Sequence, residues 1–296
     1  MTIIDEKLIK ETSEKLYVKA AIHASPDGVE ALKKATKKET DPSARERLET
    51  ILRNIELAEE LGKPMCQTFA TPAAYIKLGT EAKVRGDLYR AIAEGVSRAT
   101  DLGYLRPSIV EPISRIATGG NTGRYIPNVE IELMNGADYL DITVHCTTEL
   151  PPSNVKVLYP YEIGEDGIGV RKFVVDTVMK AGGVACPPMA VGVGVGGSLD
   201  IAARLSKIVS LSPWTNPNPD PLMASWEENL LRAVNRTNIG PFGLGGDTTA
   251  IAVKVDIAHA HAADLPVAVN LFCWACTMRK ASAKIHADGH VEYQQP

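Results

Sequence analysis

The stretch GGVACPPMAVGVGVGGSLDIAARLSKIVSL, residues 182–211, decides the fold class. Its short apolar run at residues 190–195 predicts a buried strand, and residues 199–211 follow with the spacing of a helix. The paired glycines at its start end a further predicted helix over residues 170–181. A helix, a buried strand and a second helix in this order are typical of an α/β fold.

The rest of the chain places predicted helices mainly before residue 120 and strands mainly after it. Further helices are predicted at residues 8–20, 42–61, 88–102 and 221–235, and strands at 128–134, 138–145, 250–257 and 267–272. We therefore expect an α/β fold in a single domain, with a helical layer or lobe over about residues 1–120 packed on a mixed α/β lobe over about residues 121–296.

Composition excludes several classes of protein. The 296 residues are 45% hydrophobic and 23% charged, which is ordinary for a globular protein with a substantial core. The net charge of −4 and the absence of a basic stripe argue against nucleic-acid binding. The N-terminal MTIIDEKLIKETSEKL lacks the apolar segment of a secretory signal, and later apolar runs are too short to cross a membrane. We expect a cytoplasmic protein whose thiols stay reduced.

Five cysteines carry the first chemical signal. Cys66, Cys186 and Cys273 lie far apart in apolar, Gly- and Pro-rich settings and together could hold an iron–sulfur cluster with one iron left open. Five thiols also admit disulfides, zinc and redox chemistry. Cys273 and Cys276 form a C-x-x-C pair, but a zinc site needs a second pair or suitable histidines. We interpret Cys146 and Cys276 as packed thiols.

Two glycine clusters invite a cofactor hypothesis. Residues 192–197 contain G-x-G-x-x-G between a predicted strand and helix, the pattern of a dinucleotide-binding turn. The acidic residue expected about 20 positions later falls in a Pro-rich loop, at Asp220. The alternatives are close packing of strand against helix, or backbone amides presented to an anion. The second cluster, residues 240–246, lacks the ending of a P-loop.

Four segments, residues 182–198, 216–231, 239–253 and 261–275, resemble in order the α region of class I, iron–sulfur-dependent fumarate hydratases and L-tartrate dehydratases. The resemblance spans most of residues 60–285 and implies a 4Fe–4S cluster held by Cys66, Cys186 and Cys273. It implies a hydro-lyase that reversibly adds or removes water on a small dicarboxylic hydroxy acid, such as malate or tartrate. The open iron would act as a Lewis acid on the substrate hydroxyl.

The same resemblance implies four further site residues. Gln67 follows Cys66 as in the family motif C-Q-D-T-G, and Arg98 in GVSRA matches an arginine that binds carboxylate. Gly119 in TGGNT matches a turn whose glycine amide faces the substrate, and His261 precedes AADLP where the family has a histidine near the substrate. We predict His261 to be catalytic and the other three to bind substrate. The alternatives are a solvated helix arginine and a core histidine.

Two departures from the family pattern bear on substrate choice. Thr68 replaces an acid, and HCTTELPPSN at residues 145–154 replaces a segment close to K-G-G-G-S-E-N, with loss of a lysine and of the glycine run. We therefore leave the exact substrate open.

Single-chain members of the family carry a further β region, whereas this sequence stops at Pro296. The resemblance therefore implies a separate β subunit, an α2β2 heterotetramer and a lone chain without activity. Two other classes stay open, a non-catalytic iron–sulfur or regulatory subunit and a dinucleotide-dependent oxidoreductase.

Overall fold

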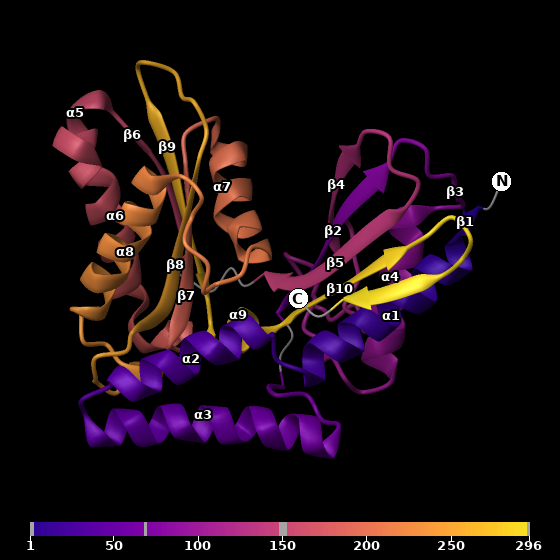
Figure 1. The fold of residues 1–296 in the computed structure, drawn as a ribbon, viewed down its shortest axis with the longest axis horizontal. Coiled ribbons are helices and arrows are strands. Elements are labelled where there is room, and N and C mark those ends of the chain that lie inside the picture. Colours follow the sequence, from indigo (N-terminus) through magenta and orange to yellow (C-terminus); the bar gives the residue numbers. More distant parts are fainter. Residues whose placement is uncertain (1–2, 68–69, 148–152, 295–296) are drawn as a thin grey trace. The chain divides into compact units, whose positions relative to one another are not determined.

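The computed structural model describes residues 3–67, 70–147 and 153–294, which form two compact units (Figure 1). Unit 1 comprises residues 1–26, 54–147 and 278–296, and unit 2 comprises residues 27–53 and 148–277. Each unit has its own sheet and helices, which confirms the mixed α/β fold class. The expected lobe boundary near residue 120 does not coincide with this division, because a strand from before residue 120 pairs with two strands from after it.

Unit 1 is built on a five-stranded mixed sheet of order β11-β10-β5-β2-β4, in which only β2 and β4 run parallel. A short parallel pair, β1 with β3, lies apart from this sheet. The elements of unit 1 are β1 (Ile4–Asp5), α1 (Glu6–Ile22), β2 (Thr71–Gly79), β3 (Val84–Arg85), α4 (Leu88–Asp101), β4 (Asn128–Met134), β5 (Leu140–Thr147), β10 (Lys280–Ile285) and β11 (Val291–Gln294).

Helix α1 packs against both the sheet of unit 1 and helix α4. The Asp5 carboxylate caps its first turn by accepting the Leu8 N–H at 2.9 Å. The Tyr17 hydroxyl donates to the Ala73 carbonyl of β2 at 3.0 Å, and burial raises the pKa of this phenol. Helix α4 approaches closely because it has a glycine, Gly95, at the crossing, where an added Cβ would lie 2.6 Å from the Ser13 Cβ.

Unit 2 contains a four-stranded sheet of order β6-β9-β7-β8, in which β7 and β8 are parallel and the other pairs antiparallel. Helix α7 covers one face, and α6 and α8 cover the other (Figure 1). The division between units falls at the start of α2 and within α3. The elements are α2 (Pro26–Lys38), α3 (Pro42–Leu61), β6 (Asn154–Leu158), α5 (Pro160–Ile163), η1 (Glu165–Gly167), α6 (Ile168–Ala181), η2 (Gly182–Ala185), β7 (Met189–Val195), α7 (Leu199–Ile208), η3 (Val209–Leu211), α8 (Pro221–Asn235), η4 (Pro241–Gly243), β8 (Ala250–Ile257), β9 (Leu265–Phe272) and α9 (Trp274–Met278).

The glycines of β7 explain the G-x-G-x-x-G pattern by packing. Gly192 and Gly194 lie inside the strand, where an added Cβ would come within 2.0 Å of the Ser206 carbonyl oxygen and 2.1 Å of the Ala202 carbonyl oxygen of α7. A dinucleotide-binding turn has its glycines in the loop between strand and helix. The pattern therefore serves close contact between β7 and α7 and lends no support to nucleotide binding.

Two polar side chains of α8 close the free edge of β8. Asn235 donates to the Ala250 carbonyl at 3.1 Å and accepts the Ala250 N–H at 2.8 Å, as a neighbouring strand would. Glu227 accepts the Val255 N–H at 3.1 Å and forms an ion pair with Lys254 at 3.3 Å. Both charged side chains are buried.

A buried carboxylate fixes the turn between α2 and α3 within unit 2. Glu39 is 1% exposed and accepts the N–H groups of Asp247 and Thr248 at 3.0 and 2.9 Å. Such charge-assisted hydrogen bonds are stronger than neutral ones.

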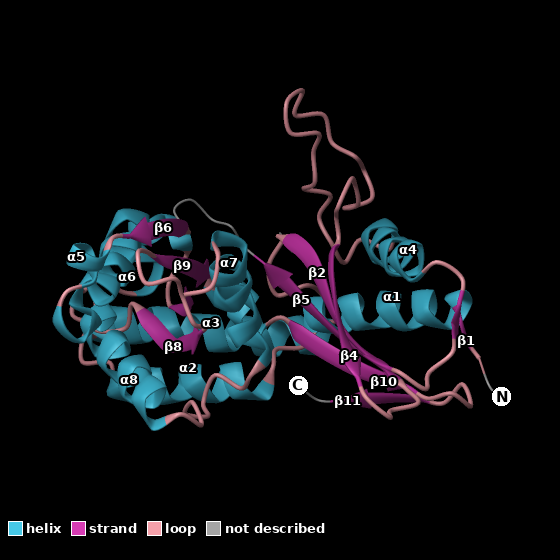
Figure 2. Ribbon diagram, turned by 90° about the horizontal axis from the view of Figure 1, so that it is seen from above, coloured by secondary structure: helices cyan, strands magenta, loops and turns pink. Residues whose placement is uncertain are grey.

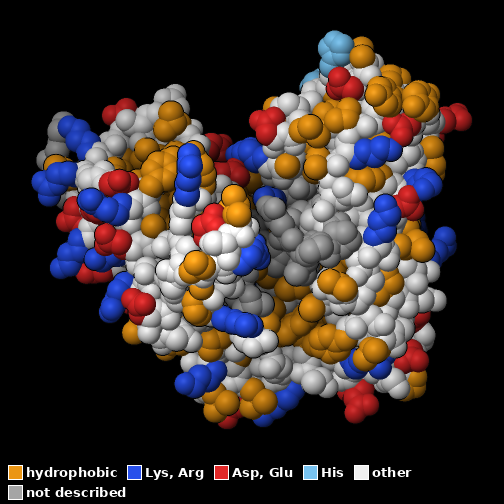
Figure 3. All heavy atoms as spheres, turned by 180° about the vertical axis from the view of Figure 1, so that it is seen from behind, with side chains coloured by type: hydrophobic (Ala, Val, Ile, Leu, Met, Phe, Trp, Pro, Cys, Tyr) orange, Lys and Arg blue, Asp and Glu red, His pale blue; other side chains and the backbone are white. Residues whose placement is uncertain are grey.

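None of the helices, as far as residues are described, is both long and apolar enough to span a membrane. Figure 3 shows acidic and basic side chains intermingled on the visible face of each unit, as expected from the small net charge.

We expect Lys254→Met to lower the free energy of unfolding of unit 2 by about 3–5 kcal/mol, because it leaves the Glu227 carboxylate buried without its cation. All three tryptophans lie in unit 2, so fluorescence during urea unfolding reports on this unit. The control, Lys172→Met, removes an exposed pair with Asp176 and should cost less than about 1 kcal/mol. Equal losses in the two variants would show that the buried pair has no special weight.

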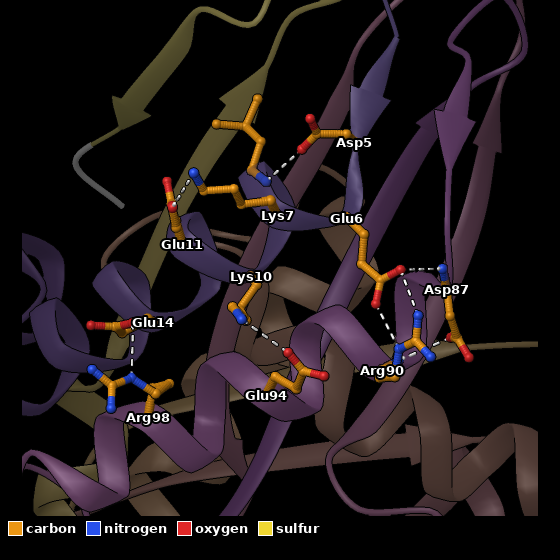
Figure 4. Close-up of polar contacts among 11 residues, drawn as sticks. Asp5, Glu6, Lys7, Lys10, Glu11, Glu14, Asp87, Arg90, Glu94 and Arg98 are labelled. Carbon is orange, nitrogen blue, oxygen red and sulfur yellow. Dashed lines mark hydrogen bonds and ion pairs between the residues drawn. The ribbon is translucent and has the colours of Figure 1, made fainter.

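A second prediction concerns the ion pairs between α1 and α4 (Figure 4). Hydrogen bonds from Arg90, together with the Asp87 N–H, lower the pKa of Glu6 from 4.5 to about 2. The stabilisation from this ionised carboxylate is therefore present above pH 4.5 and lost as the pH falls toward 2. A carboxyl NMR titration should show this midpoint, and Arg90→Gln should return it toward the usual value. Lys10→Gln should move it less, and a larger effect of Lys10→Gln would contradict the assignment.

Candidate functional site

The register between β7 and β9 brings two of the predicted cluster ligands together in unit 2. Because Ala190 pairs with Phe272 in antiparallel strands, β7 starts and β9 ends at the same end of the sheet. Cys186 stands just before β7 and Cys273 just after β9. The Trp274 N–H donates to the Cys186 carbonyl at 3.2 Å, which joins the two segments directly.

The turn that carries Cys186 is fixed by backbone contacts. The Cys186 N–H donates to the Gly183 carbonyl at 3.0 Å, and the Phe242 N–H donates to the Pro187 carbonyl at 2.8 Å. Gly183 and Gly243 touch, since an added Cβ on Gly243 would lie 2.5 Å from the Gly183 Cα. Cys186 has a φ of +49°, in the left-handed region, and is exposed. The second glycine cluster thus supports this turn.

Cys273 lies at the start of helix α9 and is 8% exposed. Its Sγ accepts the Cys276 N–H at 3.4 Å. The Cys273 carbonyl accepts the Thr277 N–H at 2.9 Å. Cys276 itself is 1% exposed and sits in the interior.

Cys66 belongs to unit 1, between α3 and β2, and is half-buried. The preceding residue is held on both sides, since the Met65 N–H donates to Ala21 at 3.0 Å and the Met65 carbonyl accepts from Asn54 Nδ2 at 2.8 Å. The Cys66 carbonyl accepts from Arg279 Nη2 at 2.6 Å. Gln67 follows and is exposed. Thr68 lies outside the described residues.

Over residues 3–67, 70–147 and 153–294, no group of three or more His, Cys, Asp or Glu side chains is arranged to hold a metal ion. Unit 2 contains Cys186 and Cys273, and unit 1 contains Cys66. These described residues include the C-x-x-C pair, for which they provide no complementary zinc ligands.

Two segments of unit 1 that carry predicted residues lead into its sheet from the same end. Strands β2 and β4 run parallel, so they begin at the same end, where Cys66 and Gln67 precede β2. The long loop before β4 carries Gly119 and extends away from α4 and β4 (Figure 2). Strand β5 ends there too, because Thr147 pairs with Thr71. The segment HCTTELPPSN therefore begins opposite the first residues of β2, where His145 pairs with Ala73, and its residues 148–152 lie outside the described part.

The loop that carries Gly119 has a defined anchor. Asn121 is fully buried, accepts the Ser108 N–H at 2.8 Å and donates to the Arg106 carbonyl at 2.8 Å. Gly119 is exposed with a φ of +89°, and nothing lies within 4 Å of where a Cβ would be. Gly120 packs on helix α4, since its added Cβ would lie 2.7 Å from Ser97 Oγ.

Arg98 follows Ser97 on the exposed face of α4. Its side chain is 55% exposed, and its Nε lies 3.9 Å from Glu14 Oε2 (Figure 4). An exposed pair at this distance is weak. Ser97 contacts Gly120, whereas the guanidinium of Arg98 lies toward Glu14 of α1 and can leave this partner at little cost.

His261 lies in the connection between β8 and β9 and is exposed, so it is no core histidine. Its Nδ1 accepts the Ala263 N–H at 3.2 Å. This connection starts where β7 ends, because Val195 pairs with Ile257, whereas Cys186 precedes the start of β7. A seven-residue strand is about 20 Å long. Unit 2 therefore keeps His261 and the two cysteines at opposite ends of its sheet.

Comparison with known proteins agrees with the resemblance seen in the motifs. The family model described as fumarate hydratase (fumerase) matches residues 10–284. The L(+)-tartrate dehydratase subunit alpha of Escherichia coli (strain K12) is 33% identical over 267 residues, 88% of this chain and 86% of that protein. A protein of Methanocaldococcus jannaschii named "Putative L(+)-tartrate dehydratase subunit alpha" is 33% identical over 282 residues, 95% of this chain and 98% of that protein.

The matched residues cover both units and all of the predicted site residues. On this evidence the chain belongs to the class I fumarate hydratase family of hydro-lyases.

Proposed function

We propose that this chain is the α subunit of a 4Fe–4S-dependent hydro-lyase that reversibly adds or removes water on a small dicarboxylic hydroxy acid. Tartrate and malate are the first substrates to consider, since relatives are named L(+)-tartrate dehydratase and the family model fumarate hydratase. The contact between Trp274 and Cys186 is the observation that carries the proposal, because it brings two cysteine segments together from distant parts of the sequence.

Cys66, Cys186 and Cys273 would hold the cluster. Thiolates are the ligands that iron–sulfur clusters take, and three of them leave one iron open. The donor chemistry fits, since Cys186 presents its thiol at the surface of a fixed turn and Cys273 Sγ receives a backbone N–H. When bound, the cluster would supply a Lewis acid that makes the hydroxyl of the substrate a better leaving group.

Three groups of this chain are proposed to bind the carboxylates of the substrate. Arg98 can bind a carboxylate through two parallel hydrogen bonds once it leaves Glu14. Gly119 is exposed and nothing lies within 4 Å of where a Cβ would be, so a substrate can approach this turn from that side without meeting a side chain. Gln67 adds an exposed amide beside Cys66.

His261 is the proposed proton carrier. Because Nδ1 accepts the Ala263 N–H, the neutral ring carries its proton on Nε2. This nitrogen can donate or return a proton to a reacting group. Since His261 lies far from Cys186 and Cys273 of its own unit, its role depends on assembly with another chain.

We propose a separate β subunit as this partner, in an α2β2 assembly in the cytoplasm, because the relatives are named as alpha subunits. The lone chain should then be inactive. Chain and partner, purified together and apart under anaerobic conditions, should differ in the dehydration of tartrate and malate. Full activity of the lone chain would contradict the subunit proposal.

We expect serine substitution of Cys66, Cys186 or Cys273 to lower both iron content and hydro-lyase activity at least tenfold. Even mutation of a group that only orients a metal ligand lowers metal affinity or activity about 10- to 100-fold. Cys146→Ser is the matched control and should retain both, because Cys146 is fully buried within strand β5. Loss of iron in the control alone, with the three predicted ligands unaffected, would overturn the cluster assignment.

A change at Arg98 should raise KM for the dicarboxylate in the assembled enzyme. Arg98→Gln loses a charge-assisted pair worth about 1.5–3 kcal/mol, or roughly 10- to 150-fold in KM. Arg90→Gln removes a guanidinium from the same helix and should leave KM unchanged. Equal KM values in wild type and Arg98→Gln would leave Arg98 as a solvated helix arginine.

A further inference from the structure

A buried cation lies directly against the backbone of Cys66. Arg279 is 1% exposed and stands between helix α9 and strand β10. Its Nη2 donates to the Cys66 carbonyl at 2.6 Å. Both residues belong to unit 1. No motif in the sequence pointed to this arginine.

Burial of a guanidinium is costly unless the group makes strong hydrogen bonds. An apolar side chain of similar size would fill the same volume without that cost. The hydrogen bond to the Cys66 carbonyl is charge-assisted and therefore stronger than a neutral one. The charge is thus better explained by the peptide that it holds than by packing.

The held peptide is the one that sets the direction of the Cys66 side chain. Met65 is fixed by Ala21 and Asn54, so the chain is already anchored up to that residue. Arg279 adds an anchor at Cys66 itself. With backbone contacts at both residues, the orientation of the Cys66 Cα–Cβ bond has little freedom, as a metal ligand requires.

The backbone carbonyl of Arg279 is in turn bound by His145. The His145 ring lies in β5, fully buried, and its Nδ1 is 2.5 Å from the Arg279 carbonyl oxygen. A carbonyl only accepts, so Nδ1 carries the proton. His145 also pairs with Lys280, the next residue after Arg279, across β5 and β10. A chain of hydrogen bonds therefore runs from His145 through Arg279 to Cys66.

We propose that Arg279 is the positioning residue for Cys66: its guanidinium fixes the cysteine peptide so that the thiolate is oriented for the cluster, and His145 fixes Arg279. The inference rests on the proposed function, because it takes Cys66 to be a cluster ligand. It adds a residue outside the ligand set, and it gives a role to His145, where this sequence departs from the family pattern.

The first test uses the full chain without cluster. Amide hydrogen exchange, followed by mass spectrometry, should be about tenfold faster or more over residues 63–67 in Arg279→Met, because the anchor of Cys66 is lost. Arg279→Lys keeps the charge with a single donor group and should fall between wild type and Arg279→Met. Arg47→Met is the matched control, since Arg47 Nη2 also donates to backbone carbonyls, of Leu244 and Gly245 in unit 2. It should speed exchange near residues 244–245 and leave residues 63–67 unchanged.

Unchanged exchange over residues 63–67 in Arg279→Met would overturn the proposal. Circular dichroism checks that each variant is folded. If Arg279→Met does not fold, Arg279→Lys decides, and exchange equal to wild type in that variant counts against the proposal.

The second test measures iron loss to a chelator after reconstitution, without recourse to activity. Iron should leave Arg279→Met about tenfold faster than wild type and should leave Arg279→Lys at a rate between the two. It should leave Arg171→Met at the wild-type rate, because Arg171 Nη2 donates to the Asp166 carbonyl, which is part of none of the cysteine turns. Faster exchange with unchanged iron loss would overturn the role of Arg279 toward the cluster. A wild-type chain that binds no more iron than Cys66→Ser would instead overturn the proposed function, while the exchange result would still show that Arg279 holds the Cys66 turn.

Discussion

The antiparallel register of β7 with β9 is the constraint on which the chemistry of unit 2 depends. Because Ala190 pairs with Phe272, the chain enters β7 and leaves β9 at the same end of the sheet. A backbone hydrogen bond from Trp274 then joins the two cysteine turns. Strand β8 begins at the same end because it is parallel to β7, so the glycine-rich turn before it also packs there. A shift of this register by one residue would turn the side chains of one strand to the other face of the sheet and separate the two turns.

Unit 1 uses strand direction in a similar way. The parallel pair β2 and β4 makes two loops start from one end of the sheet, the short segment with Cys66 and the long loop with Gly119. Strand β5 adds the start of the segment in which this sequence departs from its family. The chain thus leaves β5 toward that segment at the same end of the sheet at which the Cys66 segment leads into β2. Substrate choice in this protein is therefore expected to depend on that end of the sheet.

Much of the fold follows from local patterns, and what does not follow depends on distant partners. Helices 42–61 and 221–235 and strands 128–134 and 250–257 are confirmed to the residue, because helical spacing or a short apolar run marks them. Strand β2 was not predicted, since its apolar stretch follows a run of helices and gains its partners, β4 and β5, only from later in the chain.

The candidate site shows the same division between local and distant information. Cysteines and glycine turns can be identified from residue type and motif. Arg279 cannot, because a single arginine in a sequence carries no sign of being buried. The pairing of β10 with β5 is what brings it to the Cys66 carbonyl. His261 is the opposite case, a residue that a motif identifies and the fold keeps away from the two cysteines of its own unit. His261 and the two cysteines therefore lie on one sheet but at opposite ends of it, a separation that depends on strand direction and that residue type and motif do not carry.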